Sequence, residues 1–484
     1  GERTIQRSAI HRIDPAIGRR YGPPSEAQPR SASTMRLPAL MATALVSLIA
    51  APVDAEVIVR KQSVRSLPGA LDQVLMVNDN NPELIKNDGI LFSTFPNSGT
   101  AGLPAELSGR FDLFSHHVYA GDDEASDAST LWLAVMASAL GDQPVTLNLL
   151  EGSTSLSQAT EPGQTQAPFL PLPSLMRETS SVVAAGPGSR VAGDLLAGRT
   201  APELSVRSWT LEPDQPTKLL QLPIPVQGLD PLLNGRNLQL RLNSSGPVAI
   251  ATLAAHGVDG AAPNRQQWLD LLKRQELSTK EHQPTPRGNK GKIIYSRVSG
   301  VQIGSTWQAR LTDPGSKVLE APVEPISWPI SSLEKGTLST GQVQTAELKS
   351  FYPGTAWAAH GNYGVEYDLT LPLKNSGSAP VTLKVSLDSP LKGNNNTSYL
   401  RFRDDLNGPV MFRGPVQTRG LAGSDGQPLG RQTVHLVLRQ GQPGPALGFV
   451  TLQPGASRVA RVRLIYPADA TPPQVITVQP VKQS

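Results

Sequence analysis

The sequence of 484 residues contains no cysteine. This absence excludes a disulfide framework, a zinc site made of thiolates and a cysteine nucleophile, so the fold must be stabilised by packing. Charged residues are also scarce, at 17% of the chain against a typical value of about 25%. Long surface helices need many charged side chains, and the composition therefore argues against a helical protein.

Several motifs with known chemistry are missing as well. The chain contains no G-x-S-x-G elbow, no H-E-x-x-H zinc motif, no phosphate-binding Walker loop and no EF-hand pattern. A catalytic triad assembled from residues far apart in the sequence stays open as an alternative. A carboxylate pair for glycoside hydrolysis also stays open, because the fold sets the distance between the two carboxylates.

The charge balance excludes one class of partner. The formal net charge is +4, and six arginines against three carboxylates within residues 1–34 account for +3 of it. The remaining chain is nearly neutral, which is not the basic footprint that nucleic-acid binding requires. We therefore expect no nucleic-acid partner.

Glycine and proline are abundant, with 43 and 44 residues, and they separate short segments in which apolar and polar residues alternate. The clearest of these segments is Val365–Leu387, in which two alternating runs flank the turn-forming sequence Asn-Ser-Gly-Ser-Ala-Pro. A period of two places one set of side chains on a buried face, and the sequence predicts a β-hairpin here.

The same arrangement recurs at residues 132–150 and 238–253, where an apolar run, a glycine-bearing segment, Pro-Val and a second apolar run follow one another. Pro144–Leu147 and Pro380–Leu383 are the same four residues, Pro-Val-Thr-Leu. We expect three hairpins. The fold class that follows is mainly β, with two antiparallel β-sandwich domains of immunoglobulin-like or jelly-roll-like kind and one short inserted helix.

Residues 35–55 have the three parts of a secretory signal peptide: the cation Arg36, an apolar run over 37–51, and the small-residue ending Val-Asp-Ala. Cleavage is expected after Ala55. A membrane anchor is the alternative, but the apolar run is shorter than the roughly 20 residues that a bilayer requires. The polar, arginine-rich residues 1–34 are expected to be disordered or to precede the true start.

The predicted domain organisation follows from composition. Residues 56–325 form an N-terminal β-rich domain with an inserted helix near 263–277, 326–345 form a linker, and 346–484 form a C-terminal immunoglobulin-like β-sandwich. Within the first domain, Val77–Glu83 (VNDNNPE) is interpreted as a turn and Ala184–Arg199 as a glycine-rich loop.

Four groups of residues are candidates for a site, and the sequence favours a structural role for each of them. His116 and His117 are adjacent on a predicted strand, where they point to opposite faces and cannot easily share a metal ion. The acidic residues of the 122–127 loop are more typical of a solvated loop than of a calcium site. The Gly186–Arg190 loop favours a tight turn over an anion cradle, and the tryptophans Trp209, Trp307, Trp328 and Trp357 favour core anchors over a sugar-stacking platform.

Short motifs spread over nearly the whole exported part resemble a secreted cyanobacterial family that carries only a domain-of-unknown-function name. The motifs are Leu67–Gly69, Gly89–Leu91, Arg110–Asp112, His116–His117, Ala185–Arg190 and Ser245–Val248. The resemblance implies an exported envelope protein and transfers no catalytic residue.

We therefore expect an exported structural or interaction protein of the cell envelope, located in the periplasm, at the outer membrane or outside the cell. Its expected partner is an envelope component or a polysaccharide, so the protein is expected to bind carbohydrate or the cell wall. No catalytic, cofactor-binding or metal-binding residue and no cofactor is predicted, membrane contact is expected only through the transient signal peptide, and no oligomeric state is specified. An exported hydrolase acting on polysaccharide or peptide is the alternative.

Overall fold

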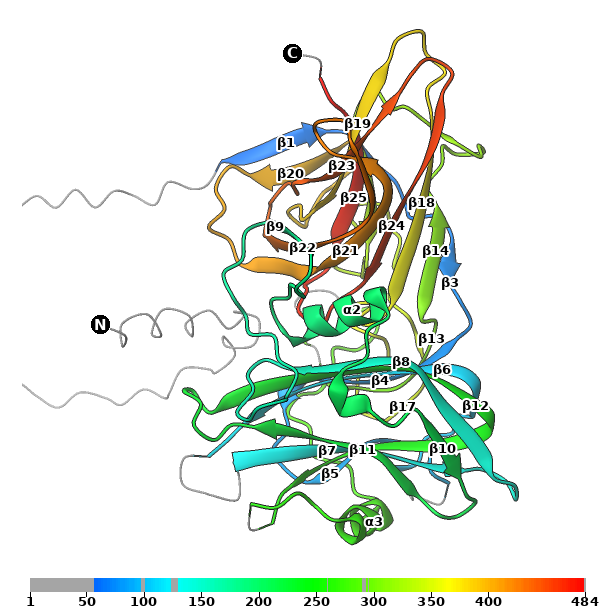
Figure 1. Ribbon diagram of the computed structural model, residues 1–484, viewed down its shortest axis with the longest axis vertical. Coiled ribbons are helices and arrows are strands. Elements are labelled where there is room, and N and C mark those ends of the chain that lie inside the picture. The colour runs from blue at the N-terminus through cyan, green and yellow to red at the C-terminus, as the bar shows by residue number, and fades with distance from the viewer. Residues whose placement is uncertain are drawn as a thin grey trace, which may run out of the picture.

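The computed structural model describes residues 56–96, 101–122, 129–258, 260–289, 293–294 and 296–482. These residues form a protein built mainly of β-strands in two large sheets, one above the other in the view of Figure 1. No helix among them is long and apolar enough to cross a membrane. The predicted signal peptide, the residues before it and nearly all of the acidic 122–127 loop lie outside the described residues.

The lower sheet in Figure 1 has ten strands in the order β10-β8-β12-β6-β4-β13-β17, with β11, β7 and β5 attached through β12. Its strands are β4 (Leu75–Leu84), β5 (Gly89–Ser93), β6 (Leu107–Ala120), β7 (Thr130–Ala139), β8 (Val145–Leu156), β10 (Ser208–Leu211), β11 (Thr217–Pro225), β12 (Leu233–His256), β13 (Val298–Ile303) and β17 (Leu348–Phe351).

The upper sheet has thirteen strands in the order β2-β16-β25-β19-β23-β21-β24-β18-β14-β3, with β15, β22 and β9 at its sides. Its strands are β2 (Ser63–Val64), β3 (Ala70–Leu71), β9 (Leu175–Arg177), β14 (Thr306–Arg310), β15 (Leu319–Glu320), β16 (Ile326–Ile330), β18 (Glu366–Lys374), β19 (Val381–Asp388), β21 (Val410–Ala422), β22 (Pro428–Arg439), β23 (Ala446–Leu452), β24 (Ser457–Ile465) and β25 (Gln474–Pro480). A separate pair consists of β1 (Val57–Lys61) and β20 (Tyr399–Arg403).

The mainly β prediction is confirmed, but the pairing is not purely antiparallel. Among the described strands, β4 pairs with β6, β14 and β15 pair with β18, and β16 pairs with β2, all in parallel. The upper sheet also takes strands from both sides of the predicted 326–345 linker, since β2, β3 and β14 lie well before it in the chain.

The predicted hairpin at 238–253 is wrong, because this segment is one continuous strand. β12 runs through Ser244–Pro247 with a register shift and does not reverse direction. Its first half pairs with β6 and β8, and its second half pairs with β7 and β5. A Ser-Gly-Pro sequence bends the strand here, and the bend lets one strand join both parts of the lower sheet.

The other two predicted hairpins have the correct strands but the wrong partners. In the Val365–Leu387 segment, β18 pairs with β24 and β14, whereas β19 pairs with β23 and β25. In the 132–150 segment, β7 and β8 both pair with β12 and not with each other. The apolar residues of β18 and β19 nevertheless meet in one buried cluster. The turns therefore connect strands that contact through side chains and not through backbone hydrogen bonds.

Two α-helices lie among the described residues. α3 (Arg265–Arg274) falls within the predicted helical segment and begins with a capping box between Asn264 and Gln267. The interpretation of Ala184–Arg199 as a loop is wrong, because Pro187–Ala197 forms α2. Proline at the first turn and a left-handed Gly198 at the end are normal helix boundaries, and the glycines obscured them.

The interpretation of VNDNNPE as a turn is also wrong. These residues lie within β4, and Asn78, Asp79 and Asn81 are almost fully buried. Their composition is typical of turns, but hydrogen bonds from neighbouring strands offset part of the cost of burial. Asn78 donates to Gln302 on β13, for example, at 2.8 Å.

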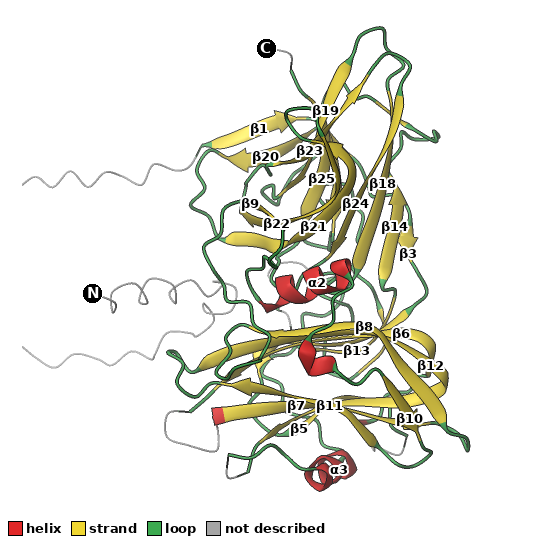
Figure 2. Cartoon of the chain, in the orientation of Figure 1, coloured by secondary structure: helices red, strands yellow, loops and turns green. Residues whose placement is uncertain are grey.

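The two sheets are joined through a layer that contains α2 (Figure 2). α2 contacts β8 of the lower sheet and β21 and β24 of the upper sheet. One face of β6 and β12 packs against the same layer, where the Gln239 side-chain amide donates to the Gly364 carbonyl at 2.8 Å. Polar residues of the two sheets come into contact at this layer.

Candidate functional site

A groove of about 1150 Å³ opens beside the connection between β21 and β22. β21 pairs with β24 as far as Arg419 and then reaches β23 only at Ala422. The strand is bent between these contacts by Gly420, whose φ is +82° and whose missing Cβ would lie 2.5 Å from the Val459 carbonyl oxygen. Only glycine fits at this position, and the bend leaves the concave surface.

Three arginines line this groove: Arg419, Arg431 and Arg458. All three are exposed, and none forms an ion pair with a carboxylate of the described residues. Arg458 donates only to the neighbouring Ser457 carbonyl, at 3.2 Å. Three unneutralised cations on one concave surface attract anions.

The neighbouring arginines of β24 are paired, in contrast to those of the groove. Arg461 donates to both carboxylate oxygens of Asp368, and Arg463 donates twice to Glu366. Acidic partners are thus provided next to the groove but not within it. The rest of the lining is apolar or hydroxyl-bearing and includes the half-buried Phe449 ring, Thr382, Thr451 and Ser424.

The groove lacks the groups that hydrolysis needs. Of the described residues that line it, none is Asp, Glu or His. Asp425 lies on the same connection but accepts a hydrogen bond from the Gln427 amide, at 3.0 Å. General acid and base catalysis needs titratable groups within hydrogen-bond reach of a substrate, so this surface is suited to binding.

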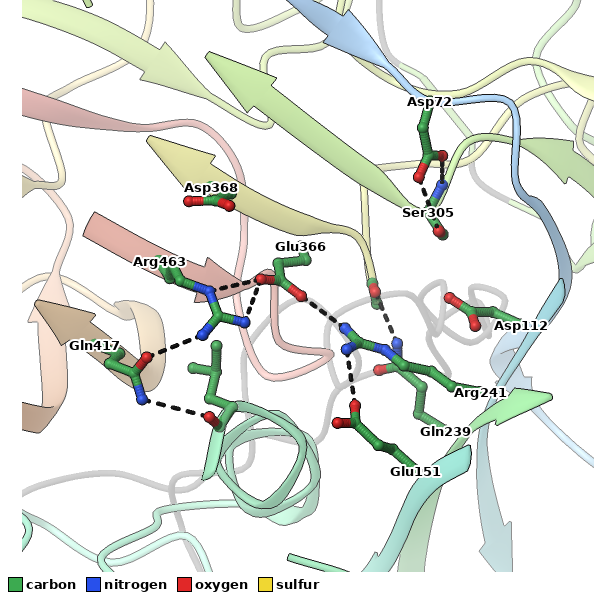
Figure 3. Close-up of polar contacts among 12 residues, drawn as sticks. Asp72, Asp112, Glu151, Gln239, Arg241, Ser305, Glu366, Asp368, Gln417 and Arg463 are labelled. Atoms are coloured by element: carbon green, nitrogen blue, oxygen red, sulfur yellow. Dashed lines mark hydrogen bonds and ion pairs between the residues drawn. The ribbon is translucent and has the colours of Figure 1, made fainter. Parts of the chain in front are cut away.

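A second polar cluster lies between the two sheets and is centred on Glu366 (Figure 3). One of its carboxylate oxygens accepts from Arg463 at 2.8 and 2.6 Å, and the other accepts from Arg241 at 2.8 Å. Arg241 also donates to Glu151 at 2.9 Å, and Arg463 donates to Gln417 at 3.0 Å. The cluster therefore links β8 and β12 of the lower sheet to β18, β21 and β24 of the upper sheet.

Electrostatics in this cluster favour the charged form of Arg241. Burial by itself lowers the pKa of Arg241, but the Glu366 and Asp112 carboxylates outweigh it and raise the pKa above its ordinary value. Both Glu366 oxygens are used within the protein, and the Glu366 side chain is 8% exposed. The cluster joins the two sheets, and neither carboxylate oxygen of Glu366 is left for a ligand.

The structure places His116 and His117 on opposite faces of β6, as the alternation predicts. His117 is fully buried and lies 3.0 Å from Asp79, and Ser115 donates to the same Asp79 oxygen at 3.4 Å. These three residue types occur in hydrolases, but here the histidine does not bridge the serine and the acid, and the group is closed to solvent. The pKa of His116 is lowered to about 4, first by burial and then by His117.

The Gly186–Arg190 segment is not a free anion cradle either, because a carboxylate of the protein itself occupies the start of α2. Asp469 accepts from the Ser189 amide at 2.8 Å and from the Ser189 hydroxyl at 3.2 Å. Burial raises the pKa of Asp469 to about 6, against the opposing effect of the Ser189 amide. This contact fastens α2 to the end of the upper sheet.

One group among the described residues has metal-ligand geometry: Glu83, Glu281 and His282, whose ligand atoms lie within 4.8 Å of one another. The Glu83 carboxylate, however, accepts the backbone amides of both other residues. The Lys86 ammonium lies 2.5 Å from the Glu281 carboxylate and already supplies a positive charge there. The role of the group is therefore structural: its hydrogen bonds attach the 281–282 segment to β4.

The four tryptophans divide into two kinds. Trp307 and Trp328 are buried in the core of the upper sheet. Trp209 is half-buried against the core of the lower sheet, and Trp357 lies under the Arg287 guanidinium, 4.6 Å from the ring centre. They do not form one platform.

Sequence reasoning did not single out Arg419, Arg431 or Arg458, because nothing local distinguishes an unpaired arginine from a paired one.

A family model described as "Protein of unknown function (DUF3370)" matches residues 62–480. The chain belongs to the DUF3370 family. The resemblance inferred from the sequence is thereby confirmed at the level of an uncharacterised family. A search of curated proteins found no match to this DUF3370 chain.

Proposed function

We propose that this DUF3370 protein is an exported, non-catalytic binding protein of the cell envelope and that it binds an acidic polysaccharide in the groove beside β21. The observation that carries the proposal is the set of three exposed arginines on one concave surface, for which the described part of the chain supplies no carboxylate partner. Guanidinium groups pair with carboxylate and sulfate groups in bidentate fashion. The Phe449 ring and the neighbouring hydroxyls offer stacking and hydrogen bonds to sugar rings.

Three finer expectations belong to the same proposal. The two sheets correspond to two β-sandwich domains of immunoglobulin-like kind, and the family is a secreted, cyanobacterial one. The signal-peptide pattern at 35–55 supports export. Amino-terminal sequencing of the exported protein should begin at Glu56, and full-length cytosolic protein would contradict export.

The proposed ligand class is tested with a matched pair of polymers, dextran sulfate and neutral dextran. Binding to dextran sulfate alone is expected, and it should weaken with rising salt because exposed charges are screened. The triple variant Arg419→Gln, Arg431→Gln, Arg458→Gln should bind at least about tenfold more weakly. Its control neutralises three exposed cations of the α3 region at the opposite end of the molecule, Arg265→Gln, Lys273→Gln and Arg274→Gln.

Two results would overturn this proposal. Equal losses in both triple variants would show a non-specific charge effect, and tighter binding of polyglutamate than of any acidic polysaccharide would assign the groove to a protein partner. The rival hydrolase is tested in the same samples by the release of reducing ends. Turnover that is abolished by a His or carboxylate substitution would contradict a binding protein.

A further inference from the structure

Among the described strands, β1 is an edge strand with one unpaired side. It pairs there with β20 alone, in the antiparallel register that places Ile58 opposite Phe402 and Arg60 opposite Leu400. In Figure 1, β1 lies on the outside of the upper part of the molecule. An unpaired strand edge presents backbone donors and acceptors to any strand that approaches it.

The hydrogen bonds at the ends of β1 show which residues face that open edge. The Asp404 amide donates to the Glu56 carbonyl, and the Gln62 amide donates to the Ser398 carbonyl. Even-numbered residues of β1 therefore direct their backbone groups toward β20. In an antiparallel ladder, the odd-numbered Val57, Val59 and Lys61 then direct theirs outward.

The side chains of β1 are unusually apolar for an exposed edge. Val57 is 46% exposed, Ile58 is 46% exposed and Val59 is 61% exposed. Protein edges are ordinarily protected by charges, proline or bulges, and β1 has none of these in its first three residues. Of the cations that follow, Lys61 pairs with Glu324, and Arg60 lies over the Phe402 ring and pairs with Asp388 through one of its guanidinium nitrogens.

We propose that β1 pairs with β1 of a second copy of this chain, antiparallel about a two-fold axis at Ile58. In this register, Val57 faces Val59 of the second copy, and both have outward backbone groups for reciprocal hydrogen bonds. Glu56 then faces Arg60 of the second copy. Arg60 uses Nε for Gln62 and Nη2 for Asp388, which leaves Nη1 for the incoming carboxylate. This self-complementary charge pattern selects a second copy over an unrelated strand.

The pairing would present two grooves on one dimer, so a polymeric ligand could be bound at two points with increased avidity. The dimer does not depend on the proposed ligand. Its failure would leave the binding proposal intact, and failure of glycan binding would leave the dimer intact.

The test is the molar mass in solution of the full chain and of the form that begins at Glu56, by analytical ultracentrifugation up to about 100 µM. We expect a concentration-dependent dimer. Val59→Pro removes an outward N–H that does not serve β20 and should weaken dimerisation at least about tenfold. Val59→Thr keeps the N–H and the β-branched shape and should retain most of the dimer.

A second variant covers the case in which Val59→Pro disturbs β1 itself. Val57→Lys combined with Val59→Lys places like charges opposite one another in the proposed register, so it should also yield a monomer with an unchanged melting temperature. A wild-type monomer throughout the concentration range would overturn the proposal. So would a dimer that all three variants retain, and so would a monomer that binds a foreign strand peptide at β1.

Discussion

Single residues in this protein act mainly through what surrounds them. Asp469 is an ordinary carboxylate in the sequence, but the structure buries it at the start of α2, where it accepts from the Ser189 amide and hydroxyl. Arg419, Arg431 and Arg458 are ordinary arginines, but they have no acidic partner among the described residues. On the single strand β24, Arg461 and Arg463 are structural fastenings, whereas Arg458 is a candidate ligand contact.

The pH dependence of stability tests the Asp469 contact. Because burial raises the pKa of Asp469 from 3.8 to about 6, the folded chain keeps a proton that the unfolded chain has released. Its contribution to stability is present below about pH 4 and is lost as the pH rises to about 6. The free energy of unfolding of Asp469→Asn should therefore rise relative to that of the wild type, by on the order of 2 kcal/mol, as the pH increases from 4 to 7.

Urea unfolding across this pH range gives the difference between the two proteins. Asp142→Asn, in an exposed turn, is the control and should leave the curve unchanged. A constant difference between Asp469→Asn and the wild type at all pH values would contradict the raised pKa.

At the scale of the element, strands are defined locally and their partners are not. The alternation in Val365–Leu387 predicted β18 and β19 correctly, yet the two strands pair with others and meet only through apolar side chains. β12 shows the reverse error, since a sequence that resembles a turn lies inside one strand. Alternation depends on neighbours in the chain, whereas pairing depends on which distant edges are available.

The bend of β21 at Gly420 can be tested by adding one methyl group. Gly420→Ala should lower the free energy of unfolding by about 2 kcal/mol or more, because the new Cβ meets the Val459 carbonyl in addition to the strain of a positive φ. Gly426→Ala is the matched control, with φ +77° and nothing within 4 Å of the new atom.

Chemical denaturation of the two alanine variants separates the effects. The Gly426 variant measures the conformational strain alone, and we expect its loss to be about 1 kcal/mol. Equal losses in both variants would show that the close approach to Val459 does not shape the groove.

At the scale of the whole molecule, the two sheets are coupled by a charged joint. Glu366 bridges Arg241 of the lower sheet and Arg463 of the upper sheet, and α2 lies against both sheets (Figures 1 and 3). The upper sheet also includes β2 and β3 from the start of the described chain. The sheets are thus held together by chain connections as well as by ion pairs.

Removing one charge from this joint should destabilise the whole protein. Glu366→Gln leaves two partly buried guanidinium groups without their shared carboxylate, and we expect a loss of about 2–4 kcal/mol. Asp368→Asn on the same strand is the control. Its partner Arg461 is 45% exposed, so the loss there should stay below about 1 kcal/mol. Equal losses in urea denaturation would contradict a role for Glu366 in joining the sheets.

The sequence by itself determined that the described chain is mainly β, where most strands run, that a helix lies near 265–274, and that the two adjacent histidines point to opposite faces. These features depend on a period of two or 3.6 residues, which can be recognised from the order of polar and apolar residues along the chain. The helix at 187–197 has ordinary local boundaries, which its glycines obscured. Only the tertiary structure decided the strand partners, the burial of the polar strand β4 and the grouping of unpaired arginines. Each of these depends on contacts between residues far apart in the chain, and local patterning carries no information about which distant carboxylate, edge or carbonyl will be near.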